Sequence, residues 1–265
     1  MPFTNPLRTL WSTGGTAFGA WCATNSVVSA EAVAAAGYDY VCVDLQHGAV
    51  SYSDALPMLV AIAGRGSVPV CRVPANDAGV IGKVLDAGAL GVVVPLVSSP
   101  EEAARAVAAC RYPPRGIRSY GPVRASIVTG SRDVVELEQV VCAVMVETLE
   151  GLERVDEIAA TPGLDAVYVG PADLALALGL APGYQRPEPE HEAAIQAIAR
   201  ACRRHGITMG IHCDGGELAA RRRAQGAQMI TVVNDLALVR SGAAAELALA
   251  TAEAAGPGPD RIWAG

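Results

Sequence analysis

The sequence predicts a single (β/α)8 barrel, the TIM-barrel fold, on three observations. The chain has 265 residues, close to the ~250 residues of a typical single barrel. Eight short apolar runs alternate with Ala-rich segments of helical spacing. No linker or composition shift divides the chain, so residues 1–265 are expected to form one domain. Since buried apolar strands separated by helices form helix-covered parallel sheets, eight units favour a closed barrel; a doubly wound open sheet is the alternative.

The expected elements follow from this periodicity. The strands are expected at residues 17–21, 40–44, 69–73, 91–96, 142–147, 165–170, 207–211 and 228–233. The helices include residues 29–36, 77–87, 99–110, 188–204, 216–225 and 236–254. Four glycines after such helices are expected to end them in the left-handed conformation, namely Gly37, Gly88, Gly206 and Gly226. The Pro- and Gly-rich connections 111–139 and 181–189 are expected to be loops over a barrel face.

Composition excludes several classes of protein. The 51% hydrophobic content supports a large core, whereas the net charge of −7 and the 5% aromatic content give no basic surface for nucleic acid. The longest apolar stretch, residues 87–97, contains two glycines and a proline and is too short to cross a membrane. Because the first residues lack a secretion signal, a cytoplasmic location is expected. The seven cysteines include no C-x-x-C pair and are expected to be structural.

In a (β/α)8 barrel the active site lies at the carboxyl ends of the strands. Glu147 and Asp173 follow neighbouring predicted strands, and two carboxylates with water are a common way to hold a hard divalent cation. The sequence therefore predicts a metal site there. The alternatives are a helix-start carboxylate for Asp173 and a solvated or ion-paired Glu147.

Two further strand ends carry groups for an anionic substrate. Gly170-Pro171-Ala172-Asp173 leads from a strand into a helix, so its free backbone N–H groups are expected to face the mouth and bind an anion. Arg72 ends an otherwise apolar strand and suits a carboxylate or an enolate oxygen; a structural ion pair with Glu147 or Asp44 is the alternative.

Asp44 and His47 lie three residues apart after the second strand. This spacing allows the carboxylate to orient the imidazole of a general acid or base, although an isolated histidine is more often simply a polar residue on the surface. The remaining histidines lack such companions and are expected on the surface; they are His191, His205 and His212.

Six segments, in order, resemble the metal-dependent pyruvate aldolases of the HpcH/HpaI group, also called hydroxyoxoacid aldolases. They are V-D-L-Q-H-G, C-R-V-P, L-D-A-G-A-L-G-V-V-V-P, R-Y-P-P-R-G-I-R-S-Y-G, M-V-E-T and G-P-A-D-L. The resemblance spans roughly residues 17–212.

The resemblance implies a (β/α)8 barrel of the phosphoenolpyruvate/pyruvate-domain type. It also implies a class II reaction on a 4-hydroxy-2-oxo acid, with a 2-oxo acid such as pyruvate or hydroxypyruvate and an aldehyde as the small-molecule partners. It implies Mg²⁺, Mn²⁺ or Co²⁺ held by Glu147 and Asp173, and a substrate carboxylate on the N–H groups of Ala172 and Asp173. It further implies Arg72 at the enolate oxygen, His47 with Asp44 as acid/base, and a homo-oligomer, a trimer or hexamer.

The chain also departs from several relatives near these positions. It has Gln46 where they have Glu, and Met145 where they have Gln, so hydrogen bonding beside the site is expected to differ. Gln46 keeps hydrogen-bonding ability and is expected to bind substrate, whereas Met145 does not. Arg118 matches a family segment near the mouth and is expected to contact substrate, with local loop pairing as the alternative. Two other functions remain open: a citryl- or malyl-type thioester lyase, and a catalytically silent barrel that binds a metal and a 2-oxo acid.

Overall fold

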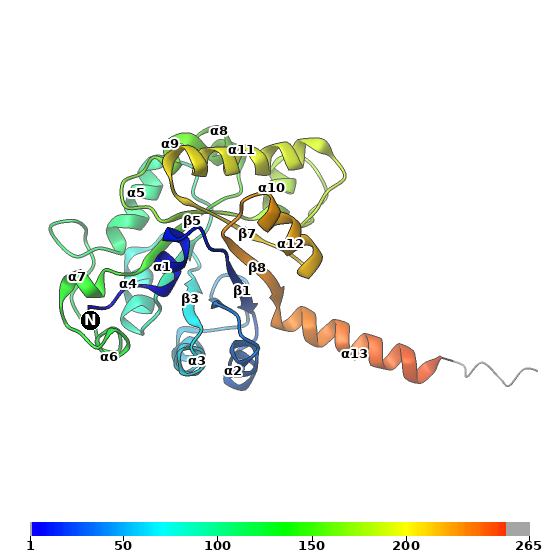
Figure 1. Cartoon of the computed structure of the whole chain (residues 1–265), viewed down its shortest axis with the longest axis horizontal. Helices are drawn as coiled ribbons and strands as arrows, with labels where there is room; N and C mark the ends of the chain where they lie inside the picture. Colours follow the sequence, from blue (N-terminus) through cyan, green and yellow to red (C-terminus); the bar gives the residue numbers. More distant parts are fainter. Residues whose placement is uncertain (1, 253–265) are drawn as a thin grey trace, which may run out of the picture.

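The computed structural model describes residues 2–252 and forms a closed barrel of eight parallel strands in chain order (Figure 1). Because β1 pairs with both β2 and β8, the barrel is closed and the open-sheet alternative is wrong. Each predicted strand is present, with ends shifted by at most two residues. The strands are β1 Ala17–Cys22, β2 Tyr40–Asp44, β3 Val68–Arg72, β4 Gly91–Val94, β5 Val141–Val146, β6 Ala166–Val169, β7 Thr208–His212 and β8 Met229–Asn234.

Helices cover the outside of this barrel. The predicted helices correspond to α2 Val27–Ala35, α4 Ala78–Asp86, α5 Pro100–Ala109, α11 Pro189–His205, α12 Gly216–Ala224 and α13 Asp235–Thr251. The end expected for the last helix, residues 253–254, lies outside the described residues. Further helices are α1 Pro6–Ser12, α3 Tyr52–Gly64, α6 Ala125–Thr129, α7 Val134–Leu137, α8 Leu149–Glu153, α9 Val155–Ala159 and α10 Pro171–Ala177. The four glycines expected after helices all have positive φ, between 65° and 97°.

The barrel interior is packed with large side chains and is not a pore. Trp21, Tyr40 and Tyr168 belong to this inner cluster, while a second cluster fills the space between strands and helices. The hydroxyl groups of Tyr40 and Tyr168 lie 3.0 and 2.7 Å from the Thr231 hydroxyl, so both phenols are hydrogen-bonded inside the barrel. All seven cysteines are buried free thiols, as predicted.

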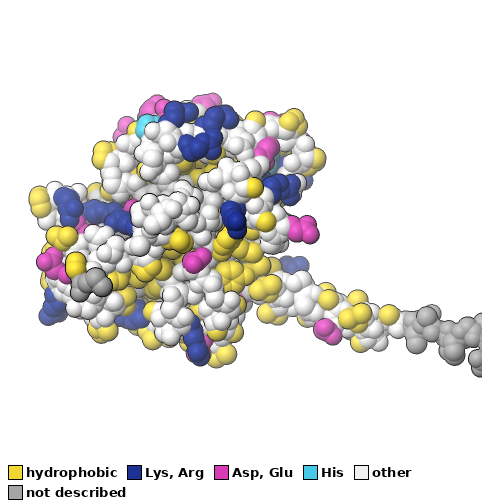
Figure 2. All heavy atoms as spheres, in the orientation of Figure 1, with side chains coloured by type: hydrophobic (Ala, Val, Ile, Leu, Met, Phe, Trp, Pro, Cys, Tyr) yellow, Lys and Arg dark blue, Asp and Glu magenta, His cyan; other side chains and the backbone are white. Residues whose placement is uncertain are grey.

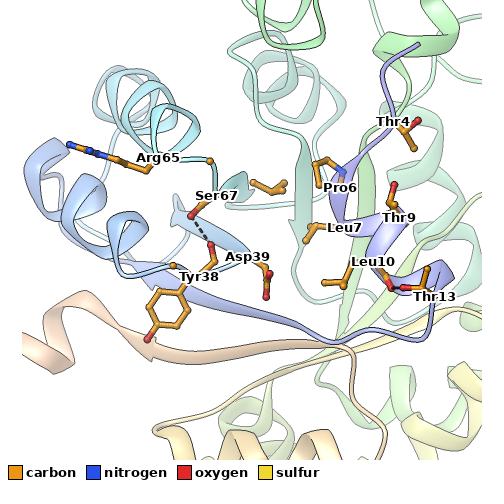
Figure 3. A pocket seen from close by; sticks show the side chains of 13 residues that line it. Thr4, Pro6, Leu7, Thr9, Leu10, Thr13, Tyr38, Asp39, Arg65 and Ser67 are labelled. Atoms are coloured by element: carbon orange, nitrogen blue, oxygen red, sulfur yellow. Dashed lines mark hydrogen bonds between the residues drawn. The ribbon is translucent and has the colours of Figure 1, made fainter. Parts of the chain in front are cut away.

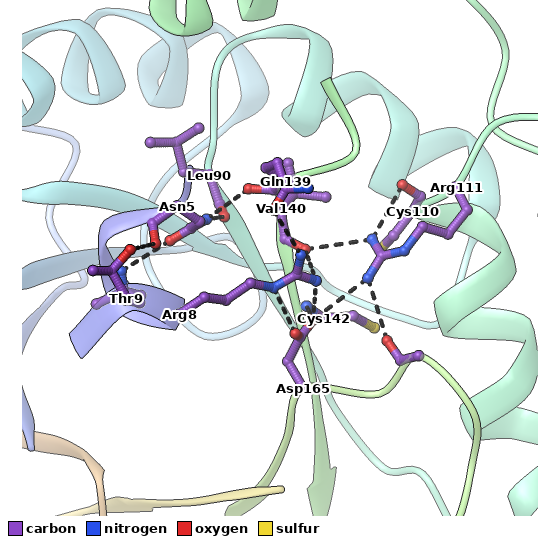
Figure 4. Close-up of polar contacts among 12 residues, drawn as sticks. Asn5, Arg8, Thr9, Leu90, Cys110, Arg111, Gln139, Val140, Cys142 and Asp165 are labelled. Atoms are coloured by element: carbon purple, nitrogen blue, oxygen red, sulfur yellow. Dashed lines mark hydrogen bonds and ion pairs between the residues drawn. The ribbon is translucent and has the colours of Figure 1, made fainter. Parts of the chain in front are cut away.

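Polar contacts close the amino-terminal end of the barrel (Figure 4). Arg8 of α1 binds Asp165 through two nitrogens, at 2.7 and 2.9 Å, and Arg111 reaches the same carboxylate at 3.5 Å. Asn5 donates to the Leu90 carbonyl at 2.8 Å. These bonds attach the α1 segment across the starts of β4 and β6.

The connection 111–139 also lies at this end, because it joins the end of α5 to the start of β5 and contains α6 and α7. The expected position of Arg118 near the mouth of its own barrel is therefore wrong. Its side chain is fully buried, donates to Asp86 at 2.7 Å and to the Leu137 carbonyl at 3.3 Å, and stacks on Tyr112. The local pairing that was the alternative for Arg118 is what the structure contains.

The final helix, α13, extends away from the barrel (Figure 1). Five large apolar side chains on it are exposed, each by 45% or more: Leu236, Leu238, Val239, Leu247 and Leu249. Figure 2 shows apolar side chains gathered where this helix leaves the body of the protein. Within residues 2–252, no helix has the length and apolarity needed to span a membrane.

Candidate active site

Glu147 is a buried carboxylate at the carboxyl end of the barrel, directly after β5, with 3% of its surface exposed. One oxygen accepts a hydrogen bond from the Leu96 N–H at 2.9 Å, and the other, Oε2, is buried without a partner among the described residues. Leu96 has a φ of 55°, a left-handed conformation that few residues other than glycine adopt. The backbone after β4 thus takes a strained conformation in which its N–H binds this carboxylate.

The environment of Glu147 favours a cation. Burial raises its pKa to about 7, the Leu96 N–H opposes this change, and the negative charge of Asp173 adds to it. Asp173 lies in the first turn of α10 and is exposed to the mouth. A buried oxygen without a partner beside a second carboxylate fits a divalent cation, since such ions bind oxygen ligands and favour the ionised form. The residues present therefore fit the metal that the sequence implied.

Gly170 makes room for this carboxylate. A methyl group added at Gly170 would overlap Glu147 Oε2 and would crowd the end of the Met145 side chain. Met145 itself is buried in the barrel interior. A glycine at this position allows the carboxylate of one strand end to pass close to the backbone of the next.

Arg72 and Asp44 form an ion pair on the opposite wall of the mouth. The guanidinium binds the carboxylate through two nitrogens, Nε to Oδ1 at 2.9 Å and Nη2 to Oδ2 at 2.5 Å. Burial alone would raise the pKa of Asp44, but the hydrogen bonds and charge of Arg72 outweigh it, so the pKa lies below its ordinary value. The pair leaves Arg72 Nη1 free of the Asp44 carboxylate, so this nitrogen remains for a ligand.

His47 lies in the turn after β2, and its imidazole is exposed. Asp44 Oδ1 accepts hydrogen bonds from the backbone N–H groups of Gln46 and His47, at 3.0 and 3.2 Å. Asp44 therefore stabilises the turn that carries His47 through these backbone N–H groups. The side chain that the Asp44 carboxylate binds is that of Arg72. Gln46 Oε1 is buried without a partner in the described part of the chain, which leaves an acceptor available beside the turn.

The segment from Gly170 to Asp173 forms the strand-to-helix connection that was predicted. Pro171 occupies the first position of α10, and the first bond within the helix is donated by Leu174 to the Gly170 carbonyl at 3.0 Å. The N–H groups of Ala172 and Asp173 precede that bond. His191 of α11 lies 2.9 Å from the Pro171 carbonyl and is buried, so its predicted surface position is wrong and it supports this turn.

Three aromatic groups of the mouth were missed by sequence reasoning. His212 ends β7 and is half-buried between Trp21 of β1 and Tyr184 of the connection between α10 and α11, so its predicted surface position is also wrong. The Arg72 guanidinium carbon lies 5.1 Å from the centre of the Trp21 ring. The signal was present, because Trp21 ends one predicted strand and His212 directly follows another, where the barrel positions functional side chains.

A separate cavity of about 730 Å³ lies at the amino-terminal end of the barrel (Figure 3). It is bordered by α1 and by the segments that precede β2 and β3. Its polar groups are engaged locally: Ser67 donates to the Tyr38 carbonyl at 2.6 Å, and Asp39 accepts from the Phe18 N–H at 2.8 Å. The groups suited to chemistry are at the other end of the barrel.

Comparison with known proteins identifies the family to which this chain belongs. Residues 17–242 match the family model described as HpcH/HpaI aldolase/citrate lyase. The chain belongs to this family. It is 39% identical over 240 residues to the hydroxypyruvate/pyruvate aldolase of Rhizorhabdus wittichii, covering 90% of this chain and 96% of the relative. It is 34% identical to the 5-keto-4-deoxy-D-glucarate aldolase of Shigella dysenteriae, covering 90% and 94%.

The solved structures give the same result for the fold of this HpcH/HpaI chain. A family protein from Burkholderia cenocepacia superposes with a TM-score of 0.84 at 34% identity, covering 92% of this chain and 98% of the other. The family predicted from six sequence segments is thus confirmed.

Proposed function

We propose that this protein is a metal-dependent aldolase that reversibly cleaves a 4-hydroxy-2-oxo acid into a 2-oxo acid, pyruvate or hydroxypyruvate, and an aldehyde. The observation that carries the proposal is the convergence of Glu147, Asp173 and Arg72 on one mouth. The relatives at 39% and 34% identity are named as aldolases, which supports the same class of reaction.

Glu147 and Asp173 would hold a divalent cation, Mg²⁺, Mn²⁺ or Co²⁺, which when bound supplies Lewis acidity toward the keto group. The two carboxylates leave other positions of such an ion to water and substrate. The N–H groups at the start of α10 would bind the carboxylate of the 2-oxo acid. The free Nη1 of Arg72 would donate a hydrogen bond to the keto oxygen.

In cleavage, the bond between carbons 3 and 4 breaks and its electron pair moves into the enolate of the 2-oxo acid. Arg72 stabilises the negative charge that develops on the enolate oxygen. His47 accepts the proton of the hydroxyl group on carbon 4 as that carbon becomes the aldehyde. The proton that His47 accepted is then returned, directly or through water, to carbon 3 of the enolate, which gives the 2-oxo acid and restores the neutral imidazole. The reverse sequence forms the carbon–carbon bond.

The decisive test is release of 2-oxo acid from a panel of 4-hydroxy-2-oxo acids, measured with chelator and with Mg²⁺, Mn²⁺ or Co²⁺ added back. We expect release only with metal. Full activity after chelation would exclude the metal-dependent mechanism. Metal and pyruvate binding without release would favour the silent barrel, and cleavage confined to citryl- or malyl-type thioesters would favour the thioester lyase.

We also propose that the chain forms a homo-oligomer in which α13 packs against a second copy. The helix after the last strand of a (β/α)8 barrel ordinarily packs on the barrel, but here its apolar side chains are exposed, including Val239 and Leu247. A Val239→Asp/Leu247→Asp variant should have a smaller mass by light scattering than the wild type. Glu246→Lys on the same helix is the matched control, and an unchanged mass in the double variant would refute the role of α13.

The seven free thiols support the expected location in a reducing compartment such as the cytoplasm.

A further inference from the structure

His212 is positioned by two aromatic rings, and its nitrogens make no hydrogen bond to another described residue. Its ring centre lies 4.9 Å from that of Trp21 and 5.3 Å from that of Tyr184, which stacks at 23°. A cavity of about 190 Å³ borders the imidazole. It lies between the ends of β7 and β8 and the start of α13, and Tyr184, Asp214 and Asn234 also line it. The ring is therefore fixed in orientation while its polar edge remains available to a ligand.

In the proposed site, carbon 3 of the donor would point toward the part of the mouth that His212 lines. The keto carbon of a 2-oxo acid is trigonal, so its oxygen, its carboxylate and carbon 3 point in three directions. In the proposed complex, the oxygen would face Arg72 and the carboxylates of Glu147 and Asp173, and the donor carboxylate would face the start of α10 after β6. Carbon 3 would then face the strand ends that remain, which are those of β7, β8, β1 and β2. His47 follows β2, while His212 and Trp21 lie side by side at the ends of β7 and β1, with the Arg72 guanidinium carbon 5.1 Å from the centre of the Trp21 ring.

His212 is a neutral hydrogen-bonding group at physiological pH. Burial, followed by the positive charge of Arg72, lowers the pKa of its imidazole to about 4. A neutral imidazole has one N–H donor and one nitrogen acceptor, which complement a hydroxyl group. A methyl group at the same place offers neither and would leave the half-buried imidazole desolvated without a partner.

We propose that His212 recognises a hydroxyl group on carbon 3 of the donor, so that the enzyme prefers a 3-hydroxy-2-oxo acid over pyruvate. This inference rests on the proposed aldolase function and names the donor class of the same site. Trp21 and Tyr184 act as positioning residues that fix the plane of the imidazole. One hydrogen bond between His212 and the donor hydroxyl group corresponds to an affinity about 10-fold to 100-fold higher than that for pyruvate.

The test measures donor binding without an aldehyde, by calorimetry on the Mn²⁺-loaded protein. Wild type should bind hydroxypyruvate more tightly than pyruvate by about 10-fold to 100-fold. His212→Leu should remove that preference by weakening hydroxypyruvate binding, while pyruvate binding changes little. His212→Asn, which keeps a polar group, should retain part of the preference. His205→Leu, at an exposed histidine on α11, is the control and should behave as wild type.

A second measurement needs no variant. In the Mg²⁺-loaded wild-type protein, the imidazole ¹⁵N resonances of His212 should shift with hydroxypyruvate and hardly change with pyruvate. Equal loss of both donors in His212→Leu, or an unchanged preference, would overturn the role of His212 while leaving the aldolase proposal intact. If wild type bound neither donor with any of the three metals and released no 2-oxo acid, both proposals would fail together.

Discussion

Replacing Glu147 with glutamine should make the metal-free protein more stable at high pH while abolishing metal binding. The buried carboxyl group has a pKa of about 7 in the folded protein, against an ordinary value of 4.5. The folded state therefore binds this proton more tightly than the unfolded state does. This contribution to the free energy of unfolding is fully present below pH 4.5 and is lost as the pH rises through 7.

The size of this stability change follows from the two pKa values of Glu147, in the folded protein and in the unfolded chain. A pKa that rises from 4.5 to about 7 corresponds to roughly 3 kcal/mol of destabilisation once the carboxyl group is ionised. Glutamine has nearly the same shape and carries no charge, and its side-chain oxygen can still accept from the Leu96 N–H. In chelator, Glu147→Gln should match wild type near pH 4.5 and exceed it by up to roughly 3 kcal/mol above pH 8.

Urea unfolding at several pH values, with chelator and with Mn²⁺, measures both effects. Mn²⁺ should stabilise wild type through binding to the folded state and leave Glu147→Gln unchanged. Glu217→Gln, at an exposed carboxylate on α12, is the control and should follow wild type throughout. The reasoning would be refuted if Glu147→Gln were less stable than wild type at pH 8, or if Mn²⁺ stabilised it as strongly.

Three further predictions concern the residues around this carboxylate. Arg72→Lys should slow proton exchange at carbon 3 of pyruvate by ~10²-fold or more, because an ammonium group cannot bind Asp44 through two nitrogens and also donate to the keto oxygen; exchange at the wild-type rate would contradict this role. His47→Ala should slow aldol cleavage by ~10²-fold to 10⁴-fold with metal affinity nearly intact, and a loss of affinity in titrations as large as in Glu147→Gln would make His47 a ligand instead. Gly170→Ala should weaken Mn²⁺ binding because the added methyl group occupies the position of Glu147 Oε2; unchanged affinity by calorimetry would show that the carboxylate relocates without cost.

The amino-acid sequence by itself determined the barrel and the positions of its strand ends. Apolar runs of strand length and Ala-rich helical segments are local signals, so periodicity located all eight strands. The barrel rule then placed Arg72 and Glu147 at one mouth, because parallel strands bring all their carboxyl ends to the same side. The left-handed glycines were also local signals, since few other residues tolerate positive φ.

Tertiary structure alone decided which side chains contact one another. Arg72 pairs with Asp44, one of the two ion pairs that the sequence left open as alternatives, because β2 and β3 are neighbours and these two residues are in register. The sequence alone could not choose between this partner, Glu147 and a free guanidinium. Arg118 was placed at the wrong end because its position was inferred from the family resemblance and not from the element order; a connection from a helix to the next strand lies at the amino-terminal end of the barrel. The raised pKa of Glu147 and the stacking of His212 depend on burial and on rings from distant strands, and neither has a local signal in the chain.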